Sequence, residues 1–400
     1  MKIGIIREGK NPPDSRVPLV PKQCAELIKE RGLDLVVQSS PIRCFKDEEY
    51  ADLGVPVVEK VEDCDVLLGV KEVPIDQLIL NKSYFFFSHT IKEQPYNRDL
   101  LRAILDKNIQ LMDYEVLTNV SGQRVIAFGY FAGMVGAYNG LLTYGKRSGA
   151  FSLKRMHQCH DYAEAKQQFN FLRLPPLKIV LTGTGRVSSG AVKVLLDMGI
   201  RQVAPKAFLT QRFPQAVFTQ LGCEEYVAKM DDSKFDLQHF FNHPAEYKSI
   251  FSPYTKVTDM MINGIYWDNA APAFFTKTDM KANDFNIEVI ADVTCDIAPE
   301  ASIPSTIKPS TIADPIFGYD PLTESEIQPF QAHSVDMMTI DNLPNELPRD
   351  ASESFGHQFI TSVLDDLLQP KSGGVIERGR MTKDGQLTER FSYLANYVKG

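Results

Sequence analysis

The sequence predicts an α/β protein made of two doubly wound, parallel-sheet domains with a cleft between them. Strand-like and helix-like segments alternate through both halves of the chain, which is the pattern of βαβ units in a parallel sheet. Its 400 residues also exceed the roughly 250–300 at which a single hydrophobic core stops growing. Together these two observations favour two domains, each with its own sheet.

The first half of the chain supplies the first set of strands. Short apolar runs bounded by turn residues predict strands at 2–6, 34–39, 65–74, 83–89 and 109–117. Apolar residues at helical spacing predict helices at 22–32, which ends in a glycine suited to a C-cap, and at 98–108. The order of these segments indicates helices on both faces of a parallel sheet.

The middle and end of the chain give a second alternating region. Residues 127–147 are apolar and rich in small side chains, so we expect a closely packed helix that joins the domains. The more polar residues 148–176 form an excursion, and a strand begins at 178 and leads into a helix. Later segments are predicted as strands at 256–267 and 287–296, a loop at 323–328 and an amphipathic helix at 350–369.

Charge and composition argue against several classes of protein. The net charge of −8 repels phosphate backbones, so nucleic acid is not an expected partner. The N-terminal apolar run is too short for a signal peptide, and no apolar stretch approaches the roughly 18 residues that span a bilayer. The six cysteines lack CxxC spacing and read as reduced thiols of a cytoplasmic protein. The segment HQCH at 157–160 fits no zinc pattern; we expect a solvated surface there and no metal.

A glycine-rich segment, GTGRVSSGA at 183–191, joins the apolar strand at 178 to the following helix. Gly183, Gly185 and Gly190 would allow the tight turn and close backbone approach that a dinucleotide phosphate needs at a helix N-terminus. The spacing GxGxxxxGA departs from GxGxxG, so a purely structural turn remains an open alternative.

The strand after this loop bears on the choice of nucleotide. We assign it to 199–209, where an acidic residue would bind the ribose 2′-hydroxyl of NAD. Arg201 and Lys206 occur there instead. Basic side chains suit a 2′-phosphate, so NADPH is slightly favoured over NADH.

Several ordered motifs resemble the superfamily of alanine dehydrogenase, transhydrogenase and saccharopine dehydrogenase. GIIREGKNPPDSRVPLVP, LLGVKEVP and FFFSHTIKEQPYN match its N-terminal motifs. The more specific resemblance is to the branch of lysine-ketoglutarate reductases, which make saccharopine. DYEVLTNVSGQRVIAFGYFAGMVGA, INGIYWDNAAP, ADVTCDI, DPIFGYDP and IDNLPNELPRDASESFG look like that branch, and GQLTERFSYL looks like the stretch that precedes a second dehydrogenase in bifunctional relatives.

The resemblance implies a fold and an activity. It implies two Rossmann-like domains: a discontinuous substrate domain, 1–133 plus 342–400, and a dinucleotide-binding domain, 134–341. It also implies NAD(P)-dependent interconversion of saccharopine with lysine and 2-oxoglutarate through an imine, with small molecules as partners and an oligomeric state that is left open. The alternatives are an alanine dehydrogenase-like or other opine-forming enzyme and, in a different class, a non-catalytic nucleotide sensor.

Two residues are implied as the acid–base pair. Lys71 lies just beyond the apolar run DVLLGV at 65–70, at the carboxyl end where open α/β sheets place ligands. Histidine suits proton transfer near neutral pH, and His89 ends an apolar run. The alternatives are a surface lysine paired with Glu72 and a histidine satisfied within the core.

Further positions match the family's substrate and cofactor residues. Arg16 would clamp a substrate carboxylate, and Lys92, Glu115 and Arg124 match substrate positions. Glu72 would tune neighbouring cations, and Lys10 and Asp14 match weaker positions. The residues implied in cofactor binding are Gly183, Gly185, Arg186, Val187, Gly190, Tyr266, Ile340, Asp341 and Leu343.

Overall fold

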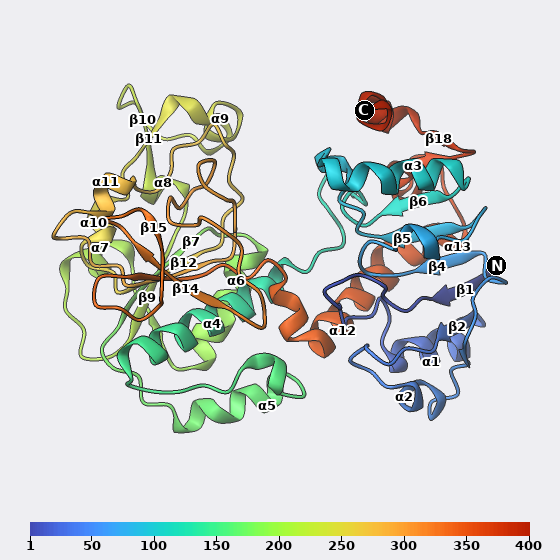
Figure 1. The fold of residues 1–400 in the computed structure, drawn as a ribbon, viewed down its shortest axis with the longest axis horizontal. Helices are drawn as coiled ribbons and strands as arrows, with labels where there is room; N and C mark the ends of the chain where they lie inside the picture. Colours follow the sequence, from blue (N-terminus) through green and yellow to red (C-terminus); the bar gives the residue numbers. More distant parts are fainter. The chain divides into compact units, whose positions relative to one another are not determined.

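The computed structural model describes residues 1–400 and divides into two compact units (Figure 1). Unit 1 contains residues 1–128 and 348–400, and unit 2 contains residues 129–347. The sequence placed these divisions at 133 and 342. The difference arises because helix α4 (Gly129–Ser148) and the 3-10 turn η7 (Leu343–Glu346) each stay whole within unit 2.

Unit 1 is a doubly wound parallel sheet in the order β3-β2-β1-β4-β5-β6. Figure 1 shows β6, β5, β4, β1 and β2 in sequence through this unit. The strands of this sheet are β1 (Lys2–Ile5), β2 (Asp34–Gln38), β3 (Val57–Val58), β4 (Val66–Leu68), β5 (Ser83–Phe86) and β6 (Gln110–Asp113). Near the C-terminus, β17 (Thr382–Lys383) and β18 (Gln386–Leu387) form a separate antiparallel pair. Its helices are α1 (Pro21–Arg31), α2 (Asp47–Ala51), α3 (Arg98–Asp106), α12 (Pro348–Phe359), α13 (Asp365–Leu368), α14 (Val375–Gly379) and α15 (Ala395–Lys399).

Alternate side chains of these strands build a core on each face of the sheet. On one face, Ile3 and Phe85 pack in a cluster with Leu27 of α1 and Phe359 of α12. A second cluster includes Tyr84 with residues of α3 and of the C-terminal segment. The five strands expected in the first half are present as parallel neighbours, although each is shorter than its apolar run.

Unit 2 contains an eight-stranded sheet in the order β15-β14-β16-β13-β12-β7-β9-β8. Its strands are β7 (Lys178–Thr182), β8 (Arg201–Gln202), β9 (Val217–Leu221), β10 (Val227–Lys229), β11 (Tyr247–Ser249), β12 (Met260–Asn263), β13 (Val289–Asp292), β14 (Ile316–Asp320), β15 (Ser325–Ile327) and β16 (Val335–Met338). Its helices are α4, α5 (Tyr162–Gln167), α6 (Arg186–Asp197), α7 (Pro205–Thr210), α8 (Cys223–Tyr226), α9 (Leu237–Asn242), α10 (Ser252–Thr255) and α11 (Lys277–Met280). β14 and β15 run antiparallel at one edge, and β10 and β11 form a separate antiparallel pair.

Two of the sequence assignments in unit 2 are wrong. The strand beside β7 is β9, whereas the segment 199–209 supplies only the two-residue edge strand β8 and then helix α7. Pro205 begins that helix, which ends the strand early. The polar residues 323–328 contain strand β15 and are not simply a loop, because an edge strand can be paired on one side while its side chains stay in water.

Helix α4 lies wholly in unit 2 and does not join the two units as expected; it packs very closely on α6. A Cβ atom on Gly133 would lie 1.7 Å from the carbonyl oxygen of Val187, and one on Gly190 would lie 1.8 Å from that of Tyr130. The small residues of α4 therefore permit backbone-to-backbone contact. None of the helices combines the length and the apolar character needed to cross a bilayer.

Candidate active site

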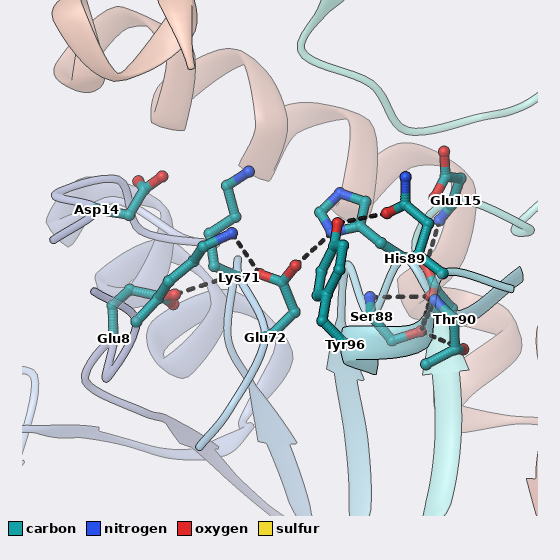
Figure 2. A network of polar contacts seen from close by, with 12 residues as sticks. Glu8, Asp14, Lys71, Glu72, Ser88, His89, Thr90, Tyr96 and Glu115 are labelled. Atoms are coloured by element: carbon teal, nitrogen blue, oxygen red, sulfur yellow. Dashed lines mark hydrogen bonds and ion pairs between the residues drawn. The ribbon is translucent and has the colours of Figure 1, made fainter. Parts of the chain in front are cut away.

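The sheet of unit 1 changes direction between β1 and β4. From β1 the chain builds strands β2 and β3 on one side, and from β4 it builds β5 and β6 on the other. In doubly wound sheets, ligands bind at the carboxyl ends of the strands beside this switch point. Lys71 and Glu72 follow β4 and His89 follows β5, so the predicted residues lie at this edge, side by side in Figure 2.

Lys71 is a half-buried amine whose pKa is well below that of an ordinary lysine. Burial disfavours the ammonium form, and the nearby cations Arg16 and Lys10 add to this, so the pKa falls to about 8. The amine forms no ion pair with Glu72, which was the alternative left open by the sequence. Lys71 can therefore gain or lose a proton near neutral pH.

Glu72 bridges a histidine and a lysine. Its Oε1 lies 2.5 Å from His89 Nδ1, and its Oε2 lies 2.9 Å from Lys10 Nζ. Burial favours the neutral acid, but the hydrogen bonds and charges of His89 and Lys10 prevail and lower the pKa of Glu72 to about 2. Glu72 accepts a hydrogen bond from His89 Nδ1, which leaves Nε2 as the ring nitrogen that can contact a ligand.

His89 is held in an unusual backbone conformation. Its φ of 54° lies in the left-handed region, which costs free energy for any residue other than glycine. The ring stacks on Phe87, with centroids 6.2 Å apart and planes inclined by 16°. The neighbours Ser88 and Thr90 are both fully buried and hydrogen bonded to each other. The ring is therefore fixed by packing on one side and by Glu72 on its edge.

Arg16 and Asp14 form a buried ion pair near Lys71. Arg16 Nη2 lies 2.5 Å from Asp14 Oδ2, Arg16 Nε lies 2.9 Å from Asp14 Oδ1, and both side chains are almost wholly inaccessible. The guanidinium also lies 4.2 Å from the centre of the Phe128 ring. One edge of Arg16 is thus engaged by Asp14, so a substrate carboxylate would have to approach another edge.

Two buried carboxylates at this sheet edge were not singled out from the sequence. Glu8 accepts the backbone N–H groups of Val70 and Lys71 at 2.7 and 2.8 Å, and burial together with the charge of Asp14 raises its pKa to about 8. Asp113 ends β6, and burial raises its pKa to about 6. Both lie at or just beyond a strand end, which is the signal that could have found them.

The remaining predicted substrate residues lie on adjoining loops of unit 1. Arg124 Nη2 is 3.4 Å from Glu115 Oε1, and Glu115 is the more buried of the two. Lys92 ends the 3-10 turn η2 (Thr90–Lys92) and is exposed. Lys92, Glu115 and Arg124 thus lie on the chain segments that follow β5 and β6.

The glycine-rich segment in unit 2 forms a strand–loop–helix turn between β7 and α6. Gly183 has a φ of 93°, which only glycine adopts readily, and Gly185 is the N-cap of α6 with open space where a side chain would be. No side chain caps the N–H groups of the first turn of α6. This geometry suits a phosphate group.

Beside this turn is a cavity of about 450 Å³. It is lined by Gly183, Thr184, Gly185, Gly222, Cys223, Tyr226, Val227, Phe240, Phe241, Pro244, Gly264, Ile265, Tyr266, Trp267, Asp268, Ala271, Pro272 and Phe274. Trp267 Nε1 is buried and has no hydrogen-bond partner. A donor of this kind in an aromatic cavity fits a ligand that carries ring nitrogens or hydroxyls, so the cavity fits the adenosine part of a dinucleotide.

The predicted cofactor residues divide into two groups. Gly183, Gly185 and Tyr266 line the cavity, whereas Gly190 serves the packing of α6 on α4. The side chains of Ile340 and Leu343 are buried, and those of Asp341 and Arg186 are exposed, while Val187 packs against α4. The sequence analysis missed Gly222 and the other aromatic residues of the lining because they come from three separate chain segments.

The HQCH segment is largely exposed, as expected, but one of its side chains also reaches a buried carboxylate. His157 Nδ1 lies 3.1 Å from Glu346 Oε2, and Arg155 Nη2 lies 2.8 Å from Glu346 Oε1. Glu346 is completely buried in η7 and also accepts a hydrogen bond from Asn139 of α4. The excursion at 148–176 therefore neutralises a buried carboxylate, which pattern reasoning could not foresee. No cluster of three metal-binding side chains occurs in the chain.

Comparisons with known proteins agree with this architecture. Residues 4–135 match the family "Alanine dehydrogenase/PNT, N-terminal domain". The chain is 30% identical over 437 residues to mouse alpha-aminoadipic semialdehyde synthase, covering 97% of this chain and 47% of that protein. It is 27% identical to a saccharopine dehydrogenase [NAD(+), L-lysine-forming] of Emericella nidulans, with 90% of each chain covered.

A solved structure of L-alanine dehydrogenase shares the fold. It aligns over the whole of both chains with a TM-score of 0.69 at 16% identity. This confirms the α/β class with parallel sheets. The chain spans about half the length of the curated synthases that it matches, such as the mouse protein.

Proposed function

We propose that this chain, a member of the alanine dehydrogenase and transhydrogenase superfamily related to the saccharopine dehydrogenases, is an oxidoreductase that uses a nicotinamide nucleotide. Its reaction joins lysine to 2-oxoglutarate to form saccharopine, or runs in reverse. The observation that carries the proposal is the array of Lys71, Glu72 and His89 at the switch point of unit 1. The similarity to saccharopine dehydrogenases over 90% of the chain supplies the substrate class.

The array suits the proton transfers that this condensation requires. The lysine amine attacks the keto carbon, and the carbinolamine must then lose water to give an imine. His89, held by Glu72 through Nδ1, would accept a proton at Nε2 as the amine attacks. Lys71, with a pKa of about 8, can donate a proton to the departing hydroxyl group.

Unit 2 supplies the nucleotide site. Gly183, Thr184, Gly185 and the first turn of α6 would hold the diphosphate, and the aromatic cavity would hold the adenosine. When bound, the nicotinamide supplies or accepts the hydride at the imine carbon. Without that hydride, the groups of unit 1 can form the imine but cannot reduce it.

The nucleotide preference that we propose is NAD(H), opposite to the one the sequence slightly favoured. Because β9 is the neighbour of β7, the discriminating position lies just after Leu221 and not at Arg201 or Lys206. Glu224 folds back against Gly222, which lines the cavity, and Glu225 accepts the Gly222 N–H at 2.8 Å. Carboxylates at this position accept ribose hydroxyls and repel a 2′-phosphate.

Two measurements on the purified chain test these proposals. Lysine, 2-oxoglutarate and reduced nucleotide should give saccharopine with loss of the nicotinamide absorbance. Turnover of pyruvate with ammonia, but not of lysine, would favour the alanine dehydrogenase-like alternative, and nucleotide binding without any turnover would favour the sensor. Titration of the single tryptophan, Trp267, should give tighter binding of NADH than of NADPH.

The preference should depend on Glu224. Glu224→Ser should narrow the difference between the two nucleotides by at least about tenfold, because it removes the repulsion of the 2′-phosphate. Lys206→Met is the matched control and should leave the preference unchanged. A loss of NADPH affinity in Lys206→Met would instead restore the assignment made from the sequence.

A further inference from the structure

A buried carboxylate connects the two loops that carry His89 and Glu115. Asp113 is fully buried at the end of β6, where its backbone pairs with Phe86 at the end of β5. Its Oδ2 accepts the Ser88 backbone N–H at 2.9 Å and also the Ser88 hydroxyl. Its Oδ1 accepts the Glu115 backbone N–H at 2.7 Å. The Asp113 side chain therefore fixes the start of both loops.

The bonds around Ser88 restrain the backbone of His89 on both sides. The Ser88 hydroxyl donates to Asp113, so its oxygen can accept from the Thr90 hydroxyl at 2.8 Å and the Thr90 N–H at 3.3 Å. His89 sits between these two residues with its left-handed φ of 54°. A histidine enters this conformation only where its surroundings impose it. The chain from Asp113 through Ser88 to Thr90 is the surrounding that does so.

We propose that Asp113 is a positioning residue of the reaction, which acts by holding His89 in its left-handed conformation and so presenting the imidazole to Glu72. The inference rests on the proposed function for its kinetic part. Asp113 is not a catalytic residue, because it is fully buried and all of its bonds reach protein groups. Its effect reaches the substrate through the His89 ring.

The substitution Asp113→Asn changes the hydrogen bonds of this side chain without changing its size. It keeps the volume but replaces one carboxylate oxygen with an NH₂ group, which then faces N–H or O–H donors of the two loops. We expect kcat to fall about 10- to 100-fold, because small misplacements of a reacting group cost this much. The affinity for NADH, read from Trp267 in unit 2, should stay within about twofold.

The test that a merely structural role would not pass is a double-mutant cycle with His89→Gln. If Asp113 acts through His89, adding Asp113→Asn to His89→Gln should change kcat by less than about threefold. Independent losses that multiply would overturn the proposal. Ser88→Ala is the second variant for the case in which Asp113→Asn does not fold, and it should give a smaller loss in the same cycle.

A spectroscopic readout needs no turnover. In protein labelled at its histidine rings, the His89 signal is identified by its absence in His89→Gln. Its chemical shift should change in Asp113→Asn and not in Asp366→Asn. Asp366 is the control because it is a carboxylate of unit 1 that also accepts two backbone N–H groups, at 3.0 and 2.8 Å. An unchanged His89 signal in Asp113→Asn would overturn the proposal. Absence of turnover in the wild type would overturn only the proposed function. The His89 signals of Asp113→Asn and Asp366→Asn would still test whether Asp113 positions the ring.

Discussion

The substitution Lys71→Met should abolish turnover and make the protein more stable. Folding lowers the pKa of Lys71 from 10.5 to about 8, so keeping this amine charged in the folded state costs about 3 kcal/mol at neutral pH. Methionine has a similar shape and no charge, so the free energy of unfolding should rise by up to about 3 kcal/mol. The group to which we assign the proton transfer is thus one that destabilises the folded state.

The stability difference between Lys71→Met and wild type should depend on pH. Below pH 8 the amine is protonated in both states, and the whole cost is present. Between about pH 8 and 10.5 the unfolded state holds the proton that the folded state has released, so wild-type stability rises with pH. The difference between Lys71→Met and wild type should therefore be largest at pH 7 and should nearly vanish by pH 10.5.

Denaturant unfolding at several pH values measures this difference. Circular dichroism follows the whole chain, and the fluorescence of Trp267 reports on unit 2 alone, so a transition absent from the fluorescence belongs to unit 1. Lys60→Met, at an exposed lysine of unit 1 without an ion pair, is the matched control and should change stability by less than about 0.5 kcal/mol. The reasoning is refuted if Lys71→Met is no more stable than wild type at pH 7, or if its advantage does not shrink at high pH.

Three further predictions concern unit 2. Gly190→Ala should prevent stable folding of unit 2, since the new Cβ would lie 1.8 Å from a carbonyl oxygen of α4. Gly185 has open space around it, so Gly185→Ala should keep the melting temperature of the wild type and should weaken nucleotide binding. Equal melting temperatures for the two variants would contradict this prediction. Arg155→Met should cost about 3–5 kcal/mol of unfolding free energy because it removes the guanidinium that pairs with the buried Glu346. The cost should become smaller in acid, where protonation of Glu346 removes the unpaired charge, and a loss that does not depend on pH would point to packing instead. Trp267→Phe should leave the melting temperature unchanged or higher, since it removes a buried unpaired donor, and should weaken NADH binding in calorimetry; unaltered affinity would remove the indole N–H from the site.

The sequence was most informative where one chain segment determines the outcome. The apolar runs before Lys71 and His89 predict strands. Because parallel strands present their carboxyl ends at one edge, both residues could be placed at the same edge of the sheet from the sequence. The loop after β7 could be placed in the same way. These inferences depend on local periodicity, which survives in the folded state.

Pairings between distant segments could not be predicted. The order β7-β9-β8 depends on which strand pairs with β7, and this pairing joins segments that are distant in the sequence. A two-residue strand such as β8 is also too short to show a hydrophobic pattern. The aromatic cavity and the Glu346 cluster each combine several segments, and so lie beyond pattern reasoning. In both cases the deciding quantity is a buried polar or aromatic group that must find partners far away in the sequence.

The distribution of charge at the edge of unit 1 explains why Lys71 is the group poised to titrate. Asp14 is committed to Arg16, and Glu72 is committed to Lys10 and His89. Glu8 turns its oxygens to backbone N–H groups, and its raised pKa leaves it mostly neutral at pH 7. The carboxylates that could have stabilised the Lys71 ammonium are therefore already paired or uncharged. An anionic substrate would supply the missing counter-charge, so binding a 2-oxo acid should raise the pKa of Lys71 and prime it as a proton donor for the dehydration step.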